Sequence, residues 1–98
     1  MKTVKNVNGN KMEVLLKGKL DAVSAPQLEA DIAAALEGIS ELIIDMGDVE
    51  YISSAGLRAL LYLHQIMSEQ GKMVIRHVPP IVQDVFELTA FYDVVTVE

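Results

Sequence analysis

Residues 42–58 read LIIDMGDVEYISSAGLR, and this stretch joins a short apolar run to the start of a helix. Leu42-Ile43-Ile44 is continuously apolar, which is typical of a strand covered on both faces in the middle of a mixed or parallel sheet. The segment after it, Asp45–Tyr51, is predicted to be a connection. The longest helix is then expected to run from Ser54 to about Gln70, with Gly71 ending it.

Two strands are predicted before this stretch. Lys2–Val7 is a weak extended run, and Asn8-Gly9-Asn10 is a hairpin signal because Asn and Gly accept the positive φ angles of tight turns. In Met12–Lys17 every second residue is apolar, which is typical of a half-buried strand. The chain is expected to leave this strand at Gly18-Lys19-Leu20-Asp21.

A helix is predicted to open at Ser24. Gln27 follows three residues later, the spacing of a capping box, and Pro26 lies in the first turn, where proline is tolerated. Gly38 is expected to end the helix, because glycine takes the left-handed conformation cheaply. The apolar stripe of this helix is expected at Leu28, Ile32, Ala35 and Leu36.

Three further elements are predicted after the longest helix. Met73-Val74-Ile75 is typical of a strand, Ile81–Leu88 of a short helix after Pro79-Pro80, and Val94–Val97 of a last strand. The order is therefore ββαβαβαβ, and strands separated by helices imply right-handed crossovers. We predict a single α/β domain over residues 1–98, with a central mixed sheet of about five strands and helices packed on it.

Composition excludes several classes of function. The 98 residues carry 8 Lys and Arg against 14 Asp and Glu, so the formal charge is −6. That sign is wrong for neutralising nucleic-acid phosphates, and it disfavours an anionic membrane surface. Cysteine is absent, which excludes disulfides, thiol catalysis and cysteine-ligated metals. No apolar run approaches the roughly 18 residues of a membrane span, and residues 1–14 lack the apolar region of a signal peptide, so we expect a cytoplasmic protein.

Ser53 and Ser54 are the candidate functional residues. They lie where a strand gives way to a helix, and sites in open α/β sheets form outside the carboxyl ends of the strands. Backbone N–H groups are unpaired at a helix N-terminus, and the helix dipole is positive there. Ser54 could equally be an N-cap and nothing more. Gly56 in the first turn favours a close approach by another backbone or by a ligand, because glycine costs roughly 1 kcal/mol in a helix relative to alanine.

The string YISSAGLRALL at residues 51–61, preceded by LIIDMGDVE, resembles the signature of the anti-sigma factor antagonist family, whose fold is the STAS domain. Gly18–Asp21 matches the G-x-[LI]-D turn of that family, and Val78–Val82 matches the entry to its third helix. Two residues depart from the family pattern, because Ser53 stands where Asp is frequent and Pro79 where Ser is frequent. The matched positions of the serine motif are Tyr51, Ile52, Ser53, Ser54, Ala55, Gly56 and Leu57.

The resemblance implies a partner switch in bacterial signalling. The unphosphorylated protein would bind an anti-sigma factor, itself a serine kinase of the GHKL type, and so free a sigma factor for transcription. Phosphorylation of Ser54 would end that binding, and a metal-dependent phosphatase would reset it. A phosphoserine adds about −1.5 to −2 charges, which a helix N-terminus tolerates, so the effect should fall on the partner interface rather than on the fold. No catalytic residue, metal or cofactor is expected, and the free protein is expected to be a monomer.

The surroundings of Ser54 are expected to include Asp21 and one side of the helix. In the family this aspartate sits by the phosphorylation site; the alternative is a turn residue that binds its own backbone. Arg58 is close enough in helical spacing to contact a phosphate, or else lies on a solvated surface. Leu57 and Leu61 flank the same side, where they either form an exposed docking edge or are covered by a neighbouring loop. The opposite, inward face of the helix is expected at Ala59, Leu63, Ile66 and Met67.

Two other functions compete with the phosphorylation switch. The domain could be a non-phosphorylated accessory subunit that docks on a transporter ATPase or on another signalling assembly. A serine hydrolase is disfavoured because a nucleophile elbow reads G-x-S-x-G, and Ile52 stands at the first glycine. Asp45 and Asp48 lack a phosphate-binding glycine loop and are expected to be strand-end and loop residues rather than Mg²⁺ ligands. His64 and His77 are expected at the surface or at its boundary.

Overall fold

The computed structural model describes all residues from 1 to 98. Its order of elements is ββαβαβαβ, as the sequence predicts, with one additional 3₁₀ turn, η1 (Phe91–Asp93), before the last strand. The helices are α1 (Ser24–Ala33), α2 (Ser54–Ser68) and α3 (Pro80–Leu88). The strands are β1 (Lys2–Asn8), β2 (Lys11–Leu20), β3 (Glu41–Ile52), β4 (Lys72–Arg76) and β5 (Thr96–Val97).

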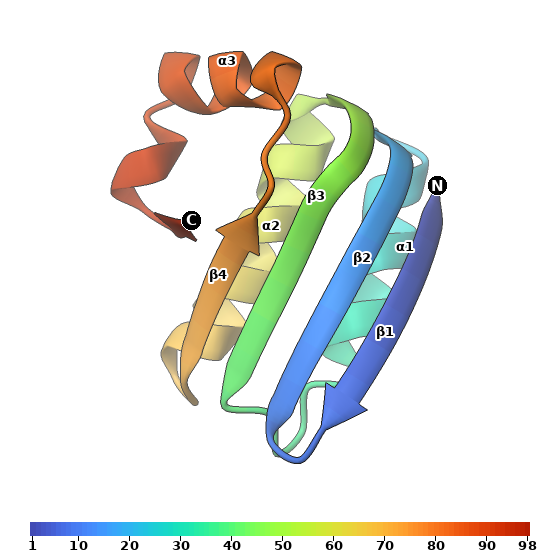
Figure 1. Ribbon diagram of the computed structural model, residues 1–98, viewed down its shortest axis with the longest axis vertical. Coiled ribbons are helices and arrows are strands. Elements are labelled where there is room, and N and C mark those ends of the chain that lie inside the picture. The colour runs from blue at the N-terminus through green and yellow to red at the C-terminus, as the bar shows by residue number, and fades with distance from the viewer.

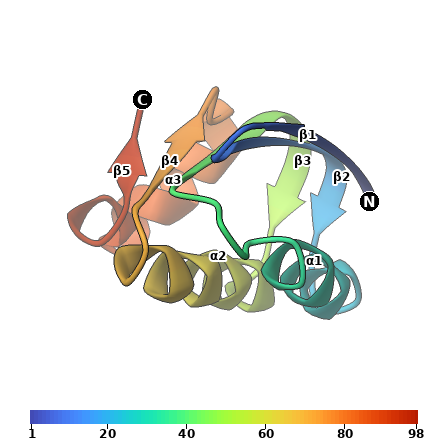
Figure 2. The ribbon, with the colours of Figure 1, turned by 90° about the horizontal axis from the view of Figure 1, so that it is seen from below.

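The five strands form one mixed sheet in the order β1-β2-β3-β4-β5. β1 and β2 make an antiparallel hairpin that turns at Gly9, whose φ is +64°, and each later pair of neighbours is parallel. Figure 1 shows α1 and α2 behind the sheet and α3 at the end where β2 and β3 finish. In Figure 2 the two longer helices lie side by side beneath the sheet. The α/β fold with a five-stranded mixed sheet is therefore confirmed.

The core lies between this sheet and the helices. The run Leu42-Ile43-Ile44 is almost completely inaccessible, as expected for a strand in the middle of a sheet. Phe86 of α3 stacks on Phe91 of η1 with ring centroids 4.5 Å apart, which fixes the C-terminal segment against the core. Each buried side chain of this size stabilises the fold by about 1.5–3 kcal/mol relative to an exposed one. The other apolar residues of the predicted strand and helix faces that are buried are Met12, Val14, Leu16, Leu28, Ile32, Leu36, Ala59, Leu63 and Met67, whereas Ala35 and Ile66 are half-buried. In α3, Val82 is buried and Val85 is half-buried.

The predicted ends of two strands are wrong. β2 continues through Leu20 rather than ending before Gly18, and the predicted connection Asp45–Tyr51 is part of β3. The two strands pair in parallel up to Leu20 and Ile52, and the register shifts twice, between Leu15 and Lys17 and between Gly18 and Lys19. One shift lies at Gly18, whose φ of +106° suits glycine. Pairing with a neighbouring strand, which local sequence does not reveal, overrides the turn-like composition of both segments.

α1 begins at Ser24, as predicted, but its predicted capping box and its predicted C-terminal end are wrong. Its N-cap is Val23, and Ser24 is the first helical residue, so the expected capping box with Gln27 does not form. The helix ends at Ala33, and Gly38 lies five residues further on in a turn, with a φ of +80°. At the C-terminus, the predicted strand Val94–Val97 is reduced to Thr96–Val97, because the N–H groups of Val94 and Val95 donate back to the Phe91 carbonyl of the 3₁₀ turn. No helix of the chain is long and apolar enough to cross a membrane.

Candidate functional site

The serine pair lies between the end of β3 and the first turn of α2. Ser53 has an extended backbone, with φ −99° and ψ 175°, and its hydroxyl accepts a hydrogen bond from the Gly56 N–H at 3.3 Å. Ser53 is therefore the N-cap, and the expectation that Ser54 fills this role is wrong. Ser54 is the first helical residue, its side chain is exposed, and its hydroxyl lies outside the cap. An exposed hydroxyl at a positive helix end is open to modification by an incoming enzyme.

Asp21 organises the loop between β2 and α1. Its Oδ1 accepts hydrogen bonds from the N–H groups of Val23 and Ser24, at 3.0 and 3.1 Å. The bonds from the Ser24 and Val23 N–H groups stabilise the charged carboxylate and lower the pKa of Asp21. The Ser24 hydroxyl donates to the Lys19 carbonyl at 2.8 Å and accepts from the Asp21 N–H at 2.9 Å. Asp21 thus binds its own backbone, one of the two expectations for this residue.

The β2–α1 and β3–α2 junctions are held next to each other by backbone pairing. Leu20 and Ile52 are register partners, and the Ser53 N–H donates to the Leu20 carbonyl at 2.9 Å. Asp21 and Ser53 each follow directly after one of these partners. The structure thereby brings Asp21, Ser53 and Ser54 to one end of the sheet, as the sequence suggests.

Gly56 permits this arrangement because it is the point at which α2 touches β2. A Cβ atom at Gly56 would lie 2.7 Å from Cγ1 of Ile52, 2.8 Å from the Leu20 carbonyl oxygen and 2.9 Å from Cγ of Leu20. The close approach that a glycine in the first turn predicts is therefore made by a neighbouring strand of the same chain. The glycine explains the position of the helix and carries no evidence for a ligand.

The α2 residues beyond the serine pair divide into two groups. Ala55, Leu57 and Leu61 are half-buried and pack against the core, which is the covered alternative for the two leucines rather than a freely exposed edge. Arg58 is exposed and forms no ion pair, so its guanidinium is available one helical turn after Ser54.

Two exposed apolar side chains at this end were not singled out from the sequence as surface residues. Val23, in the Asp21 loop, is 75% exposed, and Tyr51, just before the serine pair, is 46% exposed. Burial does not alternate here, since Glu50 and Tyr51 are both exposed between the buried Val49 and Ile52, so strand periodicity gave no signal for Tyr51. Val23 and Tyr51 both lie at the end of the sheet that carries the serine pair, together with the charged side chains of Asp21, Glu50 and Arg58.

The remaining titratable residues do not converge on the serines. Asp45 lies within β3, where its Oδ1 accepts the Gly47 N–H at 2.9 Å and its Oδ2 lies 2.9 Å from Nδ1 of His77. Burial opposes the charge of Asp45, but the Gly47 and His77 contacts outweigh it and lower its pKa. His64 is half-buried ten residues after Ser54, about 15 Å along the helix axis, with no hydrogen-bond partner for its Nδ1. No group of three or more His, Asp or Glu side chains is arranged to hold a metal.

No histidine of the chain is arranged to activate either serine as a nucleophile. A nucleophilic serine needs a base within hydrogen-bond reach, and His77 is bonded to Asp45 while His64 lies far along the same helix. A phosphate on Ser54 would instead meet the N-terminus of α2, where the dipole favours negative charge.

Comparison with known proteins identifies relatives over nearly the whole chain. The family model described as the STAS domain matches residues 2–98. A protein from Bordetella bronchiseptica described as a candidate anti-sigma factor antagonist, BtrV, is 40% identical over 81 residues, which are 81% of this chain and 70% of that protein. The anti-sigma-B factor antagonist of Bacillus subtilis is 25% identical over 91 residues, or 92% of this chain and 84% of the relative.

Solved structures with the same fold carry similar descriptions. An anti-sigma factor antagonist from Mycobacterium paratuberculosis superposes with a TM-score of 0.88 at 24% identity, covering 98% of this chain and 83% of that one. The unphosphorylated form of the anti-sigma factor antagonist SpoIIAA gives 0.85 at 18% identity, covering 99% and 88%. The phosphorylated form of Bacillus SpoIIAA gives 0.74 at 17% identity, covering 99% and 91%.

Proposed function

The chain belongs to the STAS domain family, and we propose that it acts there as an anti-sigma factor antagonist whose binding is switched off by phosphorylation of Ser54. In its unphosphorylated form it binds an anti-sigma factor, a serine kinase of the GHKL type, and releases a sigma factor. A metal-dependent phosphatase removes the phosphate. In this role residues 1–98 act as one domain, monomeric when free and located in the cytoplasm.

The observation that carries this proposal is that the two adjacent serines have different structural roles. Ser53 is occupied as the N-cap of α2, whereas the exposed hydroxyl of Ser54 lies outside the cap. Modification of Ser54 therefore need not remove the cap. The description of SpoIIAA in both phosphorylated and unphosphorylated forms supports a switch of the same kind here.

The switch works through the surface of the folded protein. A phosphate adds about −1.5 to −2 charges to a chain whose formal charge is already −6. The α2 N-terminus stabilises that charge, and Arg58, four residues later, is placed to contact it. The fold is therefore retained, while the added charge, bulk and hydration oppose a partner that docks over Ser54.

Phosphorylation by a purified anti-sigma factor kinase tests the proposal. The chain is incubated with a purified GHKL-type anti-sigma factor kinase and with ATP, and intact mass and phosphopeptide mapping follow. We expect one phosphoryl group on Ser54, none on the Ser54→Ala variant, and unchanged incorporation on Ser53→Ala. Ser54→Asp should bind the kinase more weakly than wild type while its circular dichroism is unchanged.

Phosphate on Ser53 would overturn the assignment of the acceptor. Kinase binding without any phosphate transfer would instead favour a non-phosphorylated accessory subunit. The family relatives named above are regulatory binding proteins, and an organophosphonate probe for reactive serines is expected to leave Ser54 unmodified.

A further inference from the structure

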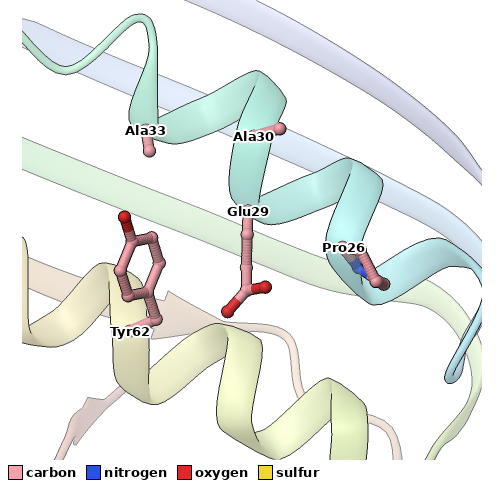
Figure 3. Close-up of a pocket in the computed structure, with 5 residues that line it drawn as sticks. All are labelled: Pro26, Glu29, Ala30, Ala33 and Tyr62. Carbon is pink, nitrogen blue, oxygen red and sulfur yellow. The ribbon is translucent and has the colours of Figure 1, made fainter.

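A hollow of about 310 Å³ lies between α1 and α2, and in Figure 3 its lining residues lie in front of the strands. Its lining residues are Pro26, Glu29, Ala30, Ala33 and Tyr62, and we call it the Glu29–Tyr62 hollow (Figure 3). The alanines of α1 leave the space open because their side chains end at Cβ. Small-molecule sites measure about 300–1,000 Å³ and enclose their ligand, so an open hollow at the bottom of that range suits a single side chain from a partner.

The walls of the hollow are an aromatic ring and a carboxylate. Figure 3 shows Glu29 reaching from α1 toward α2 and Tyr62 rising from α2 toward α1, so that the two side chains stand next to each other. Tyr62 is 45% exposed, and Glu29 is half-buried without any ion-pair partner. Five of the 14 acidic side chains, those of Glu13, Asp31, Glu41, Asp45 and Glu98, are paired with a base, and Glu29 is one of the nine that are not. A half-buried, unpaired carboxylate beside an exposed aromatic ring offers a cation a charge contact and a π face at the same place.

The surroundings reinforce the preference for positive charge. A second, smaller hollow of about 170 Å³ lies on the other side of Tyr62 and is bordered by Glu69. No lysine, arginine or histidine lines either hollow. A guanidinium group satisfies both walls at once, because its flat face stacks on an aromatic ring while its edge donates to a carboxylate.

The hollow is also linked to Ser54, the candidate phosphorylation site, by residue spacing along α2. Ser54, Arg58 and Tyr62 are spaced by four residues along α2, so they follow one stripe that turns by about 80° over about 12 Å. Pro26, in the first turn of α1, lines the end of the hollow that is nearest the Asp21 loop. A protein that docks over Ser54 therefore extends across the hollow without leaving this surface.

We propose that the Glu29–Tyr62 hollow receives an arginine side chain of the protein that binds at Ser54, an inference that rests on the proposed function. The guanidinium contacts the Glu29 carboxylate and the Tyr62 ring, and the aliphatic stem lies on Ala30 and Ala33. Tyrosine and arginine are the residue types in which interface binding energy concentrates. The proposal thus assigns a basic anchor residue to the partner, next to the surface that Ser54 controls.

A small-molecule titration tests the hollow without any partner. The ¹⁵N-labelled chain is titrated with N-acetyl-arginine amide, and with N-acetyl-citrulline amide as an uncharged probe of the same shape. We expect saturable shifts of the Ala30 and Ala33 amide signals with the arginine probe, and much smaller shifts with citrulline or in a Glu29→Gln variant. Equal responses to the two probes, or no saturable response to either, would overturn the assignment of a cation site.

Calorimetric titration against the anti-sigma factor tests the anchor. Glu29→Gln and Tyr62→Ala should each weaken binding by about 3-fold to 30-fold, the range of a cation–π or charge contact, whereas Tyr62→Phe keeps the ring and should bind nearly as wild type. Glu37→Gln, an exposed acid outside the hollow, is the matched control and should leave affinity unchanged. Wild-type affinity in Glu29→Gln and Tyr62→Ala overturns the inference and leaves the Ser54 switch intact. If the chain binds the arginine probe but no anti-sigma factor, the proposed function is refuted and only the cation site is supported.

Discussion

Replacing Gly56 with alanine tests whether the contact between α2 and β2 positions the serine pair. In an isolated helix this change stabilises by about 1 kcal/mol, because alanine has the higher helix propensity. Here the new methyl group would lie 2.8 Å from the Leu20 carbonyl oxygen and 2.7 Å from Cγ1 of Ile52, inside the closest distances at which such atoms pack. That carbonyl accepts the Ser53 N–H at 2.9 Å, and Leu20 pairs with Ile52 of β3, so it cannot move away cheaply.

The overpacking therefore dominates the propensity gain. Forcing a methyl group into a closed contact costs about 1–3 kcal/mol and more where backbone must shift, so we expect a net loss of about 1–2 kcal/mol in the free energy of unfolding. For a domain of this size 1 kcal/mol corresponds to a fall of about 4–8 °C in Tm. Displacement of α2 should also break the cap hydrogen bond, because the N–H of residue 56 is the donor to the Ser53 hydroxyl.

Urea denaturation and thermal melting of Gly56→Ala measure this loss directly. Ser54→Ala, at an exposed position of the same turn, is the matched control and should melt close to wild type. A Gly56→Ala protein as stable as wild type, or more stable, would refute the close contact and with it the argument that a neighbouring strand requires the glycine.

Three further predictions follow from the contacts at this end of the molecule. Ser53→Ala should lower the free energy of unfolding by about 0.5–1 kcal/mol, the low end for a lost cap because the bond is 3.3 Å long, and urea denaturation that showed the larger loss in Ser54→Ala would reverse the roles of the two serines. Leu61→Ala should cost about 2 kcal/mol with affinity for the anti-sigma factor near wild type, since Leu61 packs against the core; unchanged stability with weaker calorimetric binding would restore the docking edge. The pKa of Asp21 is lower in the folded than in the unfolded protein, so its charge stabilises the fold above the unfolded pKa, about 3.9. This contribution is lost as pH falls through the folded pKa. Below about pH 4, Tm should therefore fall less steeply with pH in Asp21→Asn than in wild type.

The order of the elements was predictable because it depends on local patterns. A run such as Leu42-Ile43-Ile44 can be satisfied only by burial on both faces, and the spacing of apolar residues after Ser54 fits only a helix. The location of the serine pair at the carboxyl end of a strand follows from the same order. The choice of Ser54 as acceptor rests on the family motif, and it remains a prediction.

Elements whose limits depend on a distant partner were not predictable. Asp45–Tyr51 has the glycine and acidic residues of a loop, yet it is strand because β2 lies alongside with free backbone groups to pair. β2 likewise continues as far as Leu20 because Leu20 pairs with Ile52, the last residue of β3. Propensity is a weak preference, and a long parallel ladder overrides it.

The identity of the helix cap and the reason for Gly56 also required the tertiary structure. The two adjacent serines are chemically equivalent in sequence, and only the extended backbone of Ser53, fixed by its N–H bond to the Leu20 carbonyl, makes it the cap and leaves Ser54 free. The sequence by itself determined the elements, their order and the position of the candidate switch, since these depend on residues close together in the chain. Packing of α2 against β2 and of α1 against α2 decided which serine is exposed, why position 56 has no side chain, and that Glu29 lies beside Tyr62, because each of these depends on residues far apart in the chain.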